Sequence, residues 1–145
     1  MIHLARDHQA ANDAFDEVAY EKLGINRTDG RCLDIVQNNG PMTAGRLAEL
    51  SGLTTAAVTS VLDRLEKAGY ARRVRDQKDR RQVIVELTPL LAERAAKIWG
   101  PLGKEAAAEI GRMSADELKL VMEFFRRGRD VNRRHIERVR SLSFD

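Results

Sequence analysis

The sequence of 145 residues contains one cysteine, three prolines and few aromatic residues, which make up 5% of the chain. A single cysteine excludes an internal disulfide framework and is typical of a protein from a reducing compartment. The low aromatic content disfavours a protein that stacks the bases of single-stranded nucleic acid. A chain of this length can bury an ordinary hydrophobic core, so we expect one domain spanning residues 1–145.

Long hydrophobic runs are also missing from the sequence. No segment approaches the roughly 18–20 apolar residues that a membrane-spanning helix needs. The first eight residues lack the apolar core of a signal peptide. We therefore expect a cytoplasmic protein with no membrane partner.

Motifs of common catalytic and metal sites are absent as well. The sequence has no phosphate-binding glycine loop, no G-x-S-x-G and no H-E-x-x-H. Its three histidines, His3, His8 and His135, lie far apart along the chain, whereas a zinc site needs clustered ligands. We expect neither an enzyme nor a cofactor or metal site.

The most informative stretch runs from Thr43 to Leu87. A short helical pattern, Thr43–Leu50, is followed by a three-residue turn, Ser51–Leu53. A longer helical pattern, Thr54–Lys67, comes next, and Gly69 suits a C-terminal cap with a positive φ. Two helices joined by so short a turn predict a helix-turn-helix.

The longer helix has two contrasting faces. Its apolar residues repeat at helical spacing, and they are Ala57, Val58, Val61, Leu62 and Leu65. Its other face carries Thr55, Ala56, Thr59, Ser60, Asp63 and Arg64. A helix that enters a major groove needs small polar residues at its leading end, and its N-terminal dipole favours a nearby phosphate. This face therefore predicts contact with double-stranded DNA, although an exposed polar surface remains the simpler alternative.

After Gly69 the pattern changes from helical to extended. Residues Tyr70–Arg75 and Gln82–Leu87 predict two strands, joined by the wholly polar segment Asp76–Arg81. Between Asp63 and Gln82 there are eight basic and four acidic residues, a net charge of +4 against +3 for the whole chain. A hairpin with this concentration of positive charge is expected to contact phosphates.

The motif that begins at Leu53 and ends at Tyr70, L-T-x-x-x-V-x-x-x-L-D-R-L-E-x-x-G-Y, precedes a basic wing with Asp79-Arg80-Arg81 and a strand ending Leu87-Thr88. In this combination the chain resembles the MarR family of bacterial transcription regulators. The resemblance extends over nearly the whole chain in length and helix order. One departure is Ser60, where many members of that family carry Arg or Lys, and this affects the expected base preference.

The resemblance implies that Arg81, the second arginine after the wing aspartate, reaches the minor groove. Arg64 either contacts phosphate or forms an ion pair with a neighbour, and Asp63 is expected to pair with a basic side chain. The DNA-binding residues we predict are Thr43, Thr54, Thr55, Ala56, Thr59, Ser60, Arg64, Arg73, Lys78, Arg80 and Arg81. The alternative is a winged-helix module that binds protein and does not read DNA.

Helical patterns flank this unit on both sides. Residues 2–23 form the first, and Thr28 is expected to cap a second over Asp29–Asn38. Beyond the wing, Thr88-Pro89 starts a helix that Trp99-Gly100-Pro101 is expected to interrupt or kink. Ser114–Glu117 is a capping box that begins a last helix reaching about Arg140.

These patterns predict a mainly α fold with a small β-hairpin wing, a winged helix-turn-helix flanked by N- and C-terminal dimerisation helices. The DNA-binding unit would be residues 41–88, with dimerisation helices in 1–40 and 89–145. The terminal helices have apolar stripes with little in one protomer to cover them, so we expect a homodimer. Its two reading helices would lie roughly 34 Å apart, which predicts a pseudo-palindromic site.

Family resemblance also implies a ligand-responsive repressor whose small, often aromatic effector binds between the dimerisation helices and the DNA-binding unit. The predicted effector-pocket residues are Asn12, Phe15, Cys32 and Trp99. Cys32 lies in an apolar stretch, where a buried core position is favoured over oxidant sensing, which needs an exposed, low-pKa thiolate. For Trp99 the alternatives are a core residue and a residue that lines the effector pocket.

Overall fold

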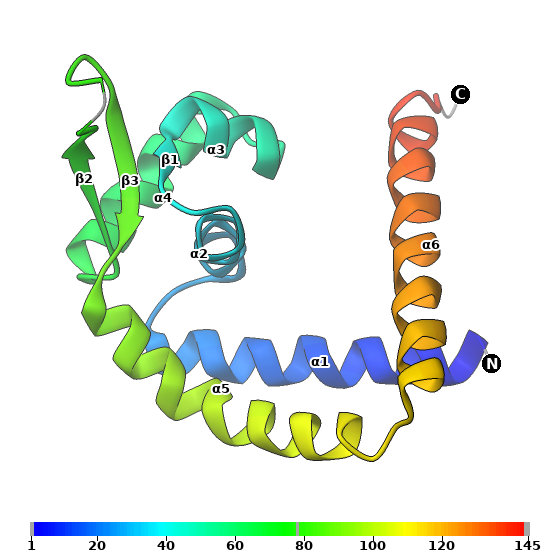
Figure 1. The fold of residues 1–145 in the computed structure, drawn as a ribbon. Coiled ribbons are helices and arrows are strands. Elements are labelled where there is room, and N and C mark those ends of the chain that lie inside the picture. The colour runs from blue at the N-terminus through cyan, green and yellow to red at the C-terminus, as the bar shows by residue number, and fades with distance from the viewer. Residues whose placement is uncertain (1, 78, 144–145) are drawn as a thin grey trace. The chain divides into compact units, whose positions relative to one another are not determined.

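The computed structural model describes residues 2–77 and 79–143, and it consists mainly of helices with one small antiparallel sheet (Figure 1). The elements are α1 (Ile2–Leu23), α2 (Arg27–Asn39), β1 (Met42–Thr43), α3 (Ala44–Ser51), α4 (Thr55–Lys67), β2 (Ala71–Arg75), β3 (Val83–Leu87), α5 (Pro89–Ile110) and α6 (Ala115–Arg140). The predicted mainly α class with a β-hairpin wing is confirmed. Among the described residues, no helix is long and apolar enough to cross a membrane.

The chain divides into two compact units, Met1–Gly100 and Pro101–Asp145, with the boundary inside α5. The first unit contains the helix-turn-helix, the sheet and the hydrophobic core. The predicted apolar face of α4 is buried there through Val58, Val61, Leu62 and Leu65. Because this face is held in the core, the opposite face of α4 is turned to solvent.

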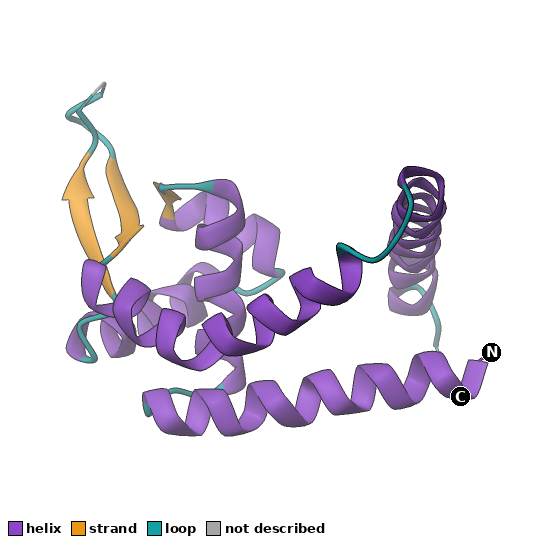
Figure 2. Cartoon of the chain, turned by 60° about the horizontal axis from the view of Figure 1, so that its bottom comes forward, coloured by secondary structure: helices purple, strands orange, loops and turns teal. Residues whose placement is uncertain are grey.

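The sheet has the strand order β1-β3-β2, and both pairs are antiparallel. Pairing of Ala71 with Leu87 and of Arg75 with Val83 makes β2 and β3 the predicted hairpin. Figure 2 shows that its connecting loop projects away from the helices of the same unit. The two-residue strand β1 was not predicted, because so short a segment has no periodicity to detect.

The start of α2 differs from the prediction. The cap is Asn26, whose side-chain Oδ1 accepts a hydrogen bond from the backbone N–H of Asp29 at 2.9 Å. Thr28 therefore lies in the first turn of the helix instead of capping it. Asparagine is as good a cap as threonine, and the backbone of Asn26 has the extended conformation that a cap requires.

Helix α5 begins at Pro89 and is capped, as predicted, by Thr88, whose hydroxyl accepts from Leu91 N and donates to the carbonyl of Gly69. Of the two alternatives at Trp99-Gly100-Pro101, the interruption is wrong, because α5 continues to Ile110 with Pro101 inside it, and the kink stays a prediction. Proline removes one helical hydrogen bond, and this loss bends or weakens a helix without always ending it.

The second unit consists of the end of α5 and the whole of α6. The predicted capping box is confirmed, since Ser114 and Glu117 exchange both hydrogen bonds. Helix α6 has no buried residue among those the structure describes. Its exposed apolar side chains include Leu120, Phe124, Phe125, Val131, Ile136 and Val139.

Candidate nucleic-acid interface

The solvent face of α4 carries the short side chains that were predicted there. Thr54 caps the helix by accepting a hydrogen bond from Ala57 N at 3.2 Å. Four exposed residues follow on this face, and they are Thr55, Ala56, Thr59 and Ser60. Their exposure excludes the inverted arrangement, in which these hydroxyls would pack into the core.

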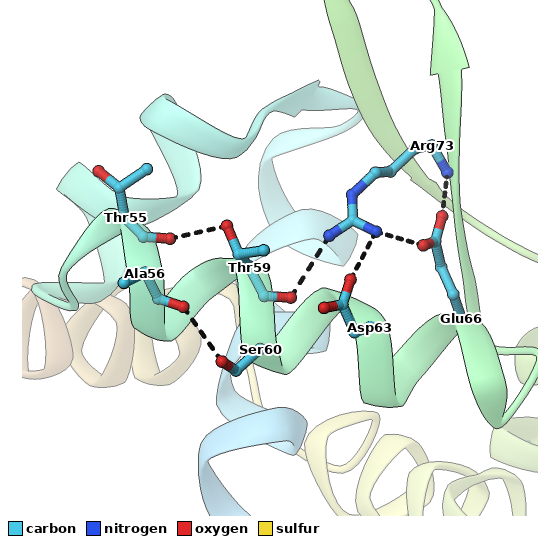
Figure 3. Close-up of polar contacts among 7 residues, drawn as sticks. All are labelled: Thr55, Ala56, Thr59, Ser60, Asp63, Glu66 and Arg73. Atoms are coloured by element: carbon cyan, nitrogen blue, oxygen red, sulfur yellow. Dashed lines mark hydrogen bonds and ion pairs between the residues drawn. The ribbon is translucent and has the colours of Figure 1, made fainter.

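Two of these hydroxyls are bonded within the helix, as Figure 3 shows. Thr59 donates to the carbonyl of Thr55 at 3.0 Å, and Ser60 donates to that of Ala56 at 3.2 Å. A hydroxyl that donates one hydrogen bond still has lone pairs that accept. In this state both side chains can accept a hydrogen bond from the amino group of a base edge.

Arg73 of β2 reaches across to the same helix (Figure 3). Its guanidinium pairs with Glu66 and, at 2.9 Å, with Asp63, and it donates to the carbonyl of Thr59 at 3.3 Å. The backbone N–H of Arg73 also donates to Glu66. The expected role of Asp63 as a partner for a basic side chain is confirmed. Arg73 itself is occupied in fixing the wing to α4, so its predicted contact with DNA stays a prediction that this geometry does not favour.

Arg64 is also held by a carboxylate. Its Nε and Nη2 atoms donate to the two oxygens of Asp29 at 3.1 and 2.5 Å, joining α4 to α2. The Asp29 side chain is 2% exposed, whereas that of Arg64 is 47% exposed. Of the two alternatives for Arg64, the ion pair is therefore present, and phosphate contact would have to use its exposed edge. Asp29 was missed because its partner lies 35 residues further along the chain.

The loop between β2 and β3 is organised by Asp79. Its carboxylate accepts from the backbone N–H of Arg81 and from the side chain of Gln82, both at 3.1 Å, and its carbonyl accepts from Gln82 N. Arg80 and Arg81 are exposed on this turn. The prediction for Lys78 lies outside the described residues.

Thr43 has a local role as well. It caps α3 by accepting from Arg46 N at 3.2 Å, and it pairs with Ile84 in the sheet. Its side chain is half-buried. The predicted DNA contact of Thr43 is untested, and the observed contacts assign its hydroxyl to the start of α3.

Residues 25–83 match the model of the MarR family. Over 141 residues the chain is 36% identical to the HTH-type transcriptional regulator YcgE of Bacillus subtilis, covering 96% of this chain and 90% of that protein. The chain belongs to the MarR family. It is accordingly a winged helix-turn-helix transcriptional regulator, as its sequence motifs had predicted.

Solved structures agree with this assignment. A MarR-like regulator from Thermotoga maritima is 25% identical, with a TM-score of 0.66 and coverage of 90% of this chain and 95% of that one. A MepR variant from S. aureus, solved bound to an oligodeoxyribonucleotide, is 17% identical, with a TM-score of 0.60 and coverage of 89% and 95%. At that identity the second likeness concerns the fold alone.

In this MarR-family chain a cavity of about 530 Å³ lies within the first unit, between α1, α2, the end of β3 and the first part of α5. Of the four predicted effector residues, only Trp99 lines it. Cys32 is 1% exposed in the core, and Asn12 and Phe15 are not among the lining residues. The Phe15 ring instead packs edge-on against Trp99, with centroids 6.4 Å apart.

Two polar groups at this cavity, one from α1 and one from α2, are hydrogen-bonded to each other. Tyr20 donates from its hydroxyl to Asp34 Oδ2 at 3.3 Å. Burial and the nearby charges of Asp34 and Asp16 raise the pKa of Tyr20 to about 12, so its hydroxyl remains a donor at neutral pH. Sequence reasoning missed Tyr20 and Asp34, because helical spacing does not tell which residues border a cavity.

Proposed function

We propose that a dimer of this chain binds a pseudo-palindromic operator in duplex DNA and represses transcription from it until a small molecule releases it. The observation that carries the proposal is the exposed, hydroxyl-lined face of α4 beside two exposed arginines of the wing. Relatives are named as transcriptional regulators, and we propose a cytoplasmic protein without catalytic activity. The bound oligodeoxyribonucleotide of MepR supports the DNA partner by analogy.

In this proposal α4 enters the major groove. Thr55, Ala56, Thr59 and Ser60 face the bases, and the N-terminus of α4 at Thr54 lies against a phosphate, where free N–H groups and the helix dipole favour an anion. The groove is wide enough for one helix, and bases there present distinct donors and acceptors. Specific readout would therefore depend on how these short side chains meet the base edges.

The wing would contact the flanking minor groove. Arg81 is the residue we propose to enter it, with Arg80 at the adjacent backbone. A narrow A·T-rich groove has an enhanced negative potential that attracts an arginine. We expect operators of this protein to be A·T-rich where the wing lies.

The dimer is proposed from the uncovered apolar side chains of the terminal helices. They include Leu4 and Val18 in α1, Leu102 in α5 and the exposed side chains of α6. Large uncovered apolar patches mark interaction sites in soluble proteins. We accordingly propose dimerisation through residues 1–40 and 89–145 and DNA binding through residues 41–88.

The deciding experiment is selection of bound fragments from the source genome, followed by fluorescence anisotropy on the selected duplex over a series of salt concentrations. Operator binding should weaken steeply as salt rises, because phosphate contacts release counterions. No measurable affinity for duplex at low salt would support the alternative, a protein-binding winged helix. Sedimentation of the free protein at micromolar concentration should give a dimer, and a monomer would contradict the proposed site symmetry.

Repression and ligand response need their own test. The cavity beside Trp99 is the proposed effector site, since it borders the end of the DNA-binding unit at Leu87 and Thr88 as well as the helices α1, α2 and α5. A ligand can release DNA only by its difference in affinity for the free and the DNA-bound shape. Reporter transcription from the selected operator should rise when the gene is deleted, and a fall would identify an activator.

A further inference from the structure

The cavity beside Trp99 has a lining with one sign of charge. Its apolar part comes mainly from Leu23, Leu33, Leu91 and Trp99. Among the residues that the structure describes, Asp34 is its only acidic lining residue, and no lysine, arginine or histidine lines it. A ligand in this cavity would therefore meet an apolar surface and a single carboxylate.

Two aromatic rings form one side of this cavity. The Tyr20 and Trp99 rings are tilted at 50° with centroids 6.3 Å apart. Tyr20 lies directly on α2 at Gly30, where an added Cβ would stand 2.4 Å from two ring carbons. Glycine at position 30 thus allows the ring to occupy this site, and an alanine there would displace it.

Each of these rings is hydrogen-bonded to a carboxylate, Asp34 of α2 or Asp16 of α1. Tyr20 donates to Asp34, and the indole N–H of Trp99 is 3.4 Å from Asp16. Asp34 forms no ion pair with a basic residue among the described part of the chain. Asp34 is an exposed residue, but partial desolvation, with the charge of Asp16 nearby, raises the pKa of its carboxyl group.

Acidic residues around a neighbouring hollow add to the negative potential near Tyr20 and Asp34. A second hollow, of about 650 Å³, shares these two residues. Its other acidic residues are Asp13, Asp16, Glu17 and Glu21, and its basic residues are Arg27 and Arg31. Arg27 is already paired with Asp13 at 2.7 Å. The acidic groups therefore outnumber the basic ones around the wall that carries Asp34.

We propose that the effector of this regulator is a small organic cation with a flat aromatic body, bound against Tyr20 and Trp99 with its charge toward Asp34. The inference rests on the proposed ligand-responsive function and specifies its ligand class. Aromatic faces attract cations through their quadrupole, and the carboxylate supplies the counter-charge. An aromatic carboxylate of the same size would bring its negative charge to Asp34 without any basic partner in the lining.

The test uses three probes of similar shape that differ in charge: N-methylquinolinium, its uncharged isostere 1-methylnaphthalene, and 1-naphthoate. Calorimetric titration of the full-length protein should give about tenfold tighter binding for the cation than for the neutral probe, equivalent to about 1.4 kcal/mol. The anion should bind more weakly than either. In Asp34→Asn the advantage of the cation should disappear while the neutral probe binds as before.

Glu105→Gln is the matched control, because it removes the same charge from an exposed position in the other unit. It should leave all three affinities unchanged. Equal or tighter binding of 1-naphthoate, an unaltered preference in Asp34→Asn, or no binding of any probe at about 1 mM would overturn the proposal. Operator binding without probes, measured on the same samples, separates these outcomes from failure of the proposed function.

Discussion

Thr59 and Ser60 lie on the face of α4 that we propose for the major groove, but neither presents a charge there. Both hydroxyls donate a hydrogen bond to a carbonyl one turn back. In the free protein this face of α4 therefore presents mainly hydrogen-bond acceptors. Because the side chain of Ser60 is short and uncharged, less of the affinity can come from this position than a long basic side chain would give. We infer that the exposed wing arginines contribute a correspondingly larger share of the binding.

Substitution of the wing arginine tests this inference. Arg81→Ala should lower operator affinity by about tenfold or more and reduce the salt slope by about one counterion. Its melting temperature should hardly change, because an exposed turn residue contributes within about 0.5 kcal/mol to stability. The measurements are anisotropy over a salt series and thermal unfolding.

Arg72→Ala provides the control, since it removes the same charge from the same hairpin. Arg72 is already paired with Glu86 at 2.5 Å, so its loss should weaken binding less. Equal losses for the two variants would mean that the wing acts through its net charge and not through an inserted side chain.

Cys32 differs from a redox-sensing thiol in both exposure and electrostatics. It is 1% exposed, and burial, with the negative charge of Asp29, raises its pKa above the ordinary value of a cysteine thiol. A raised pKa leaves less thiolate at any given pH, and the thiolate is the reactive form. At pH 7.5 the native thiol should react with Ellman's reagent at least about 100-fold more slowly than in the urea-unfolded chain. Rapid reaction of the folded protein, or loss of DNA binding on mild oxidation, would reopen a redox role.

At the scale of elements, α4 is fastened at two places by ion pairs. Asp29 joins it to α2 through Arg64, and Arg73 joins β2 to Asp63 and Glu66. The Asp29–Arg64 pair lies next to the proposed effector site, because Asp29 immediately precedes Gly30, a lining residue of the cavity. A displacement of α2 by a ligand would therefore act directly on the helix that we propose to read DNA.

The burial of the two partners makes the Asp29–Arg64 pair asymmetric. Arg64→Met leaves a carboxylate that is 2% exposed without its cation, whereas Asp29→Asn leaves an arginine that is about half exposed to water. We expect Arg64→Met to cost about 2–3 kcal/mol of unfolding free energy and Asp29→Asn about 1 kcal/mol. Urea denaturation of both variants and of the double variant measures this. The double variant should recover part of the loss, and strictly additive losses would show that the pair is not coupled.

Elements with strong local signals were predictable, and contacts between distant residues were not. The faces of α4, the hairpin, and the caps at Thr88 and Ser114 follow from spacing and residue type over a few positions. The Asn26 cap was missed, because Thr28 two positions later satisfies the same rule. The Asp29–Arg64 pair and the cavity lining depend on how α1, α2 and α5 pack, which periodicity does not encode.

At the scale of the whole molecule, the apolar side chains of α6 are left uncovered by the single chain. Met122, Phe125, Ile136 and Val139 recur at helical spacing and are all exposed in the single chain. A 26-residue helix with no buried residue among those described gains little stability from its own chain. A second copy, related by a two-fold axis, would bury such a stripe and at the same time set the spacing of the two α4 helices.

A charge in this stripe should separate the protomers. Phe125→Glu would bury a carboxylate without a partner in an apolar interface, which is strongly unfavourable, so we expect a monomer in sedimentation velocity at micromolar concentration. Operator affinity should fall by at least about 100-fold, because the two half-sites would no longer be bound as one unit. Arg134→Gln is the control, since it changes the net charge by the same amount on the opposite side of α6. If Phe125→Glu stays dimeric and binds the operator normally while the parent chain is a dimer, the protomers must associate through α1 and α5 without this face of α6.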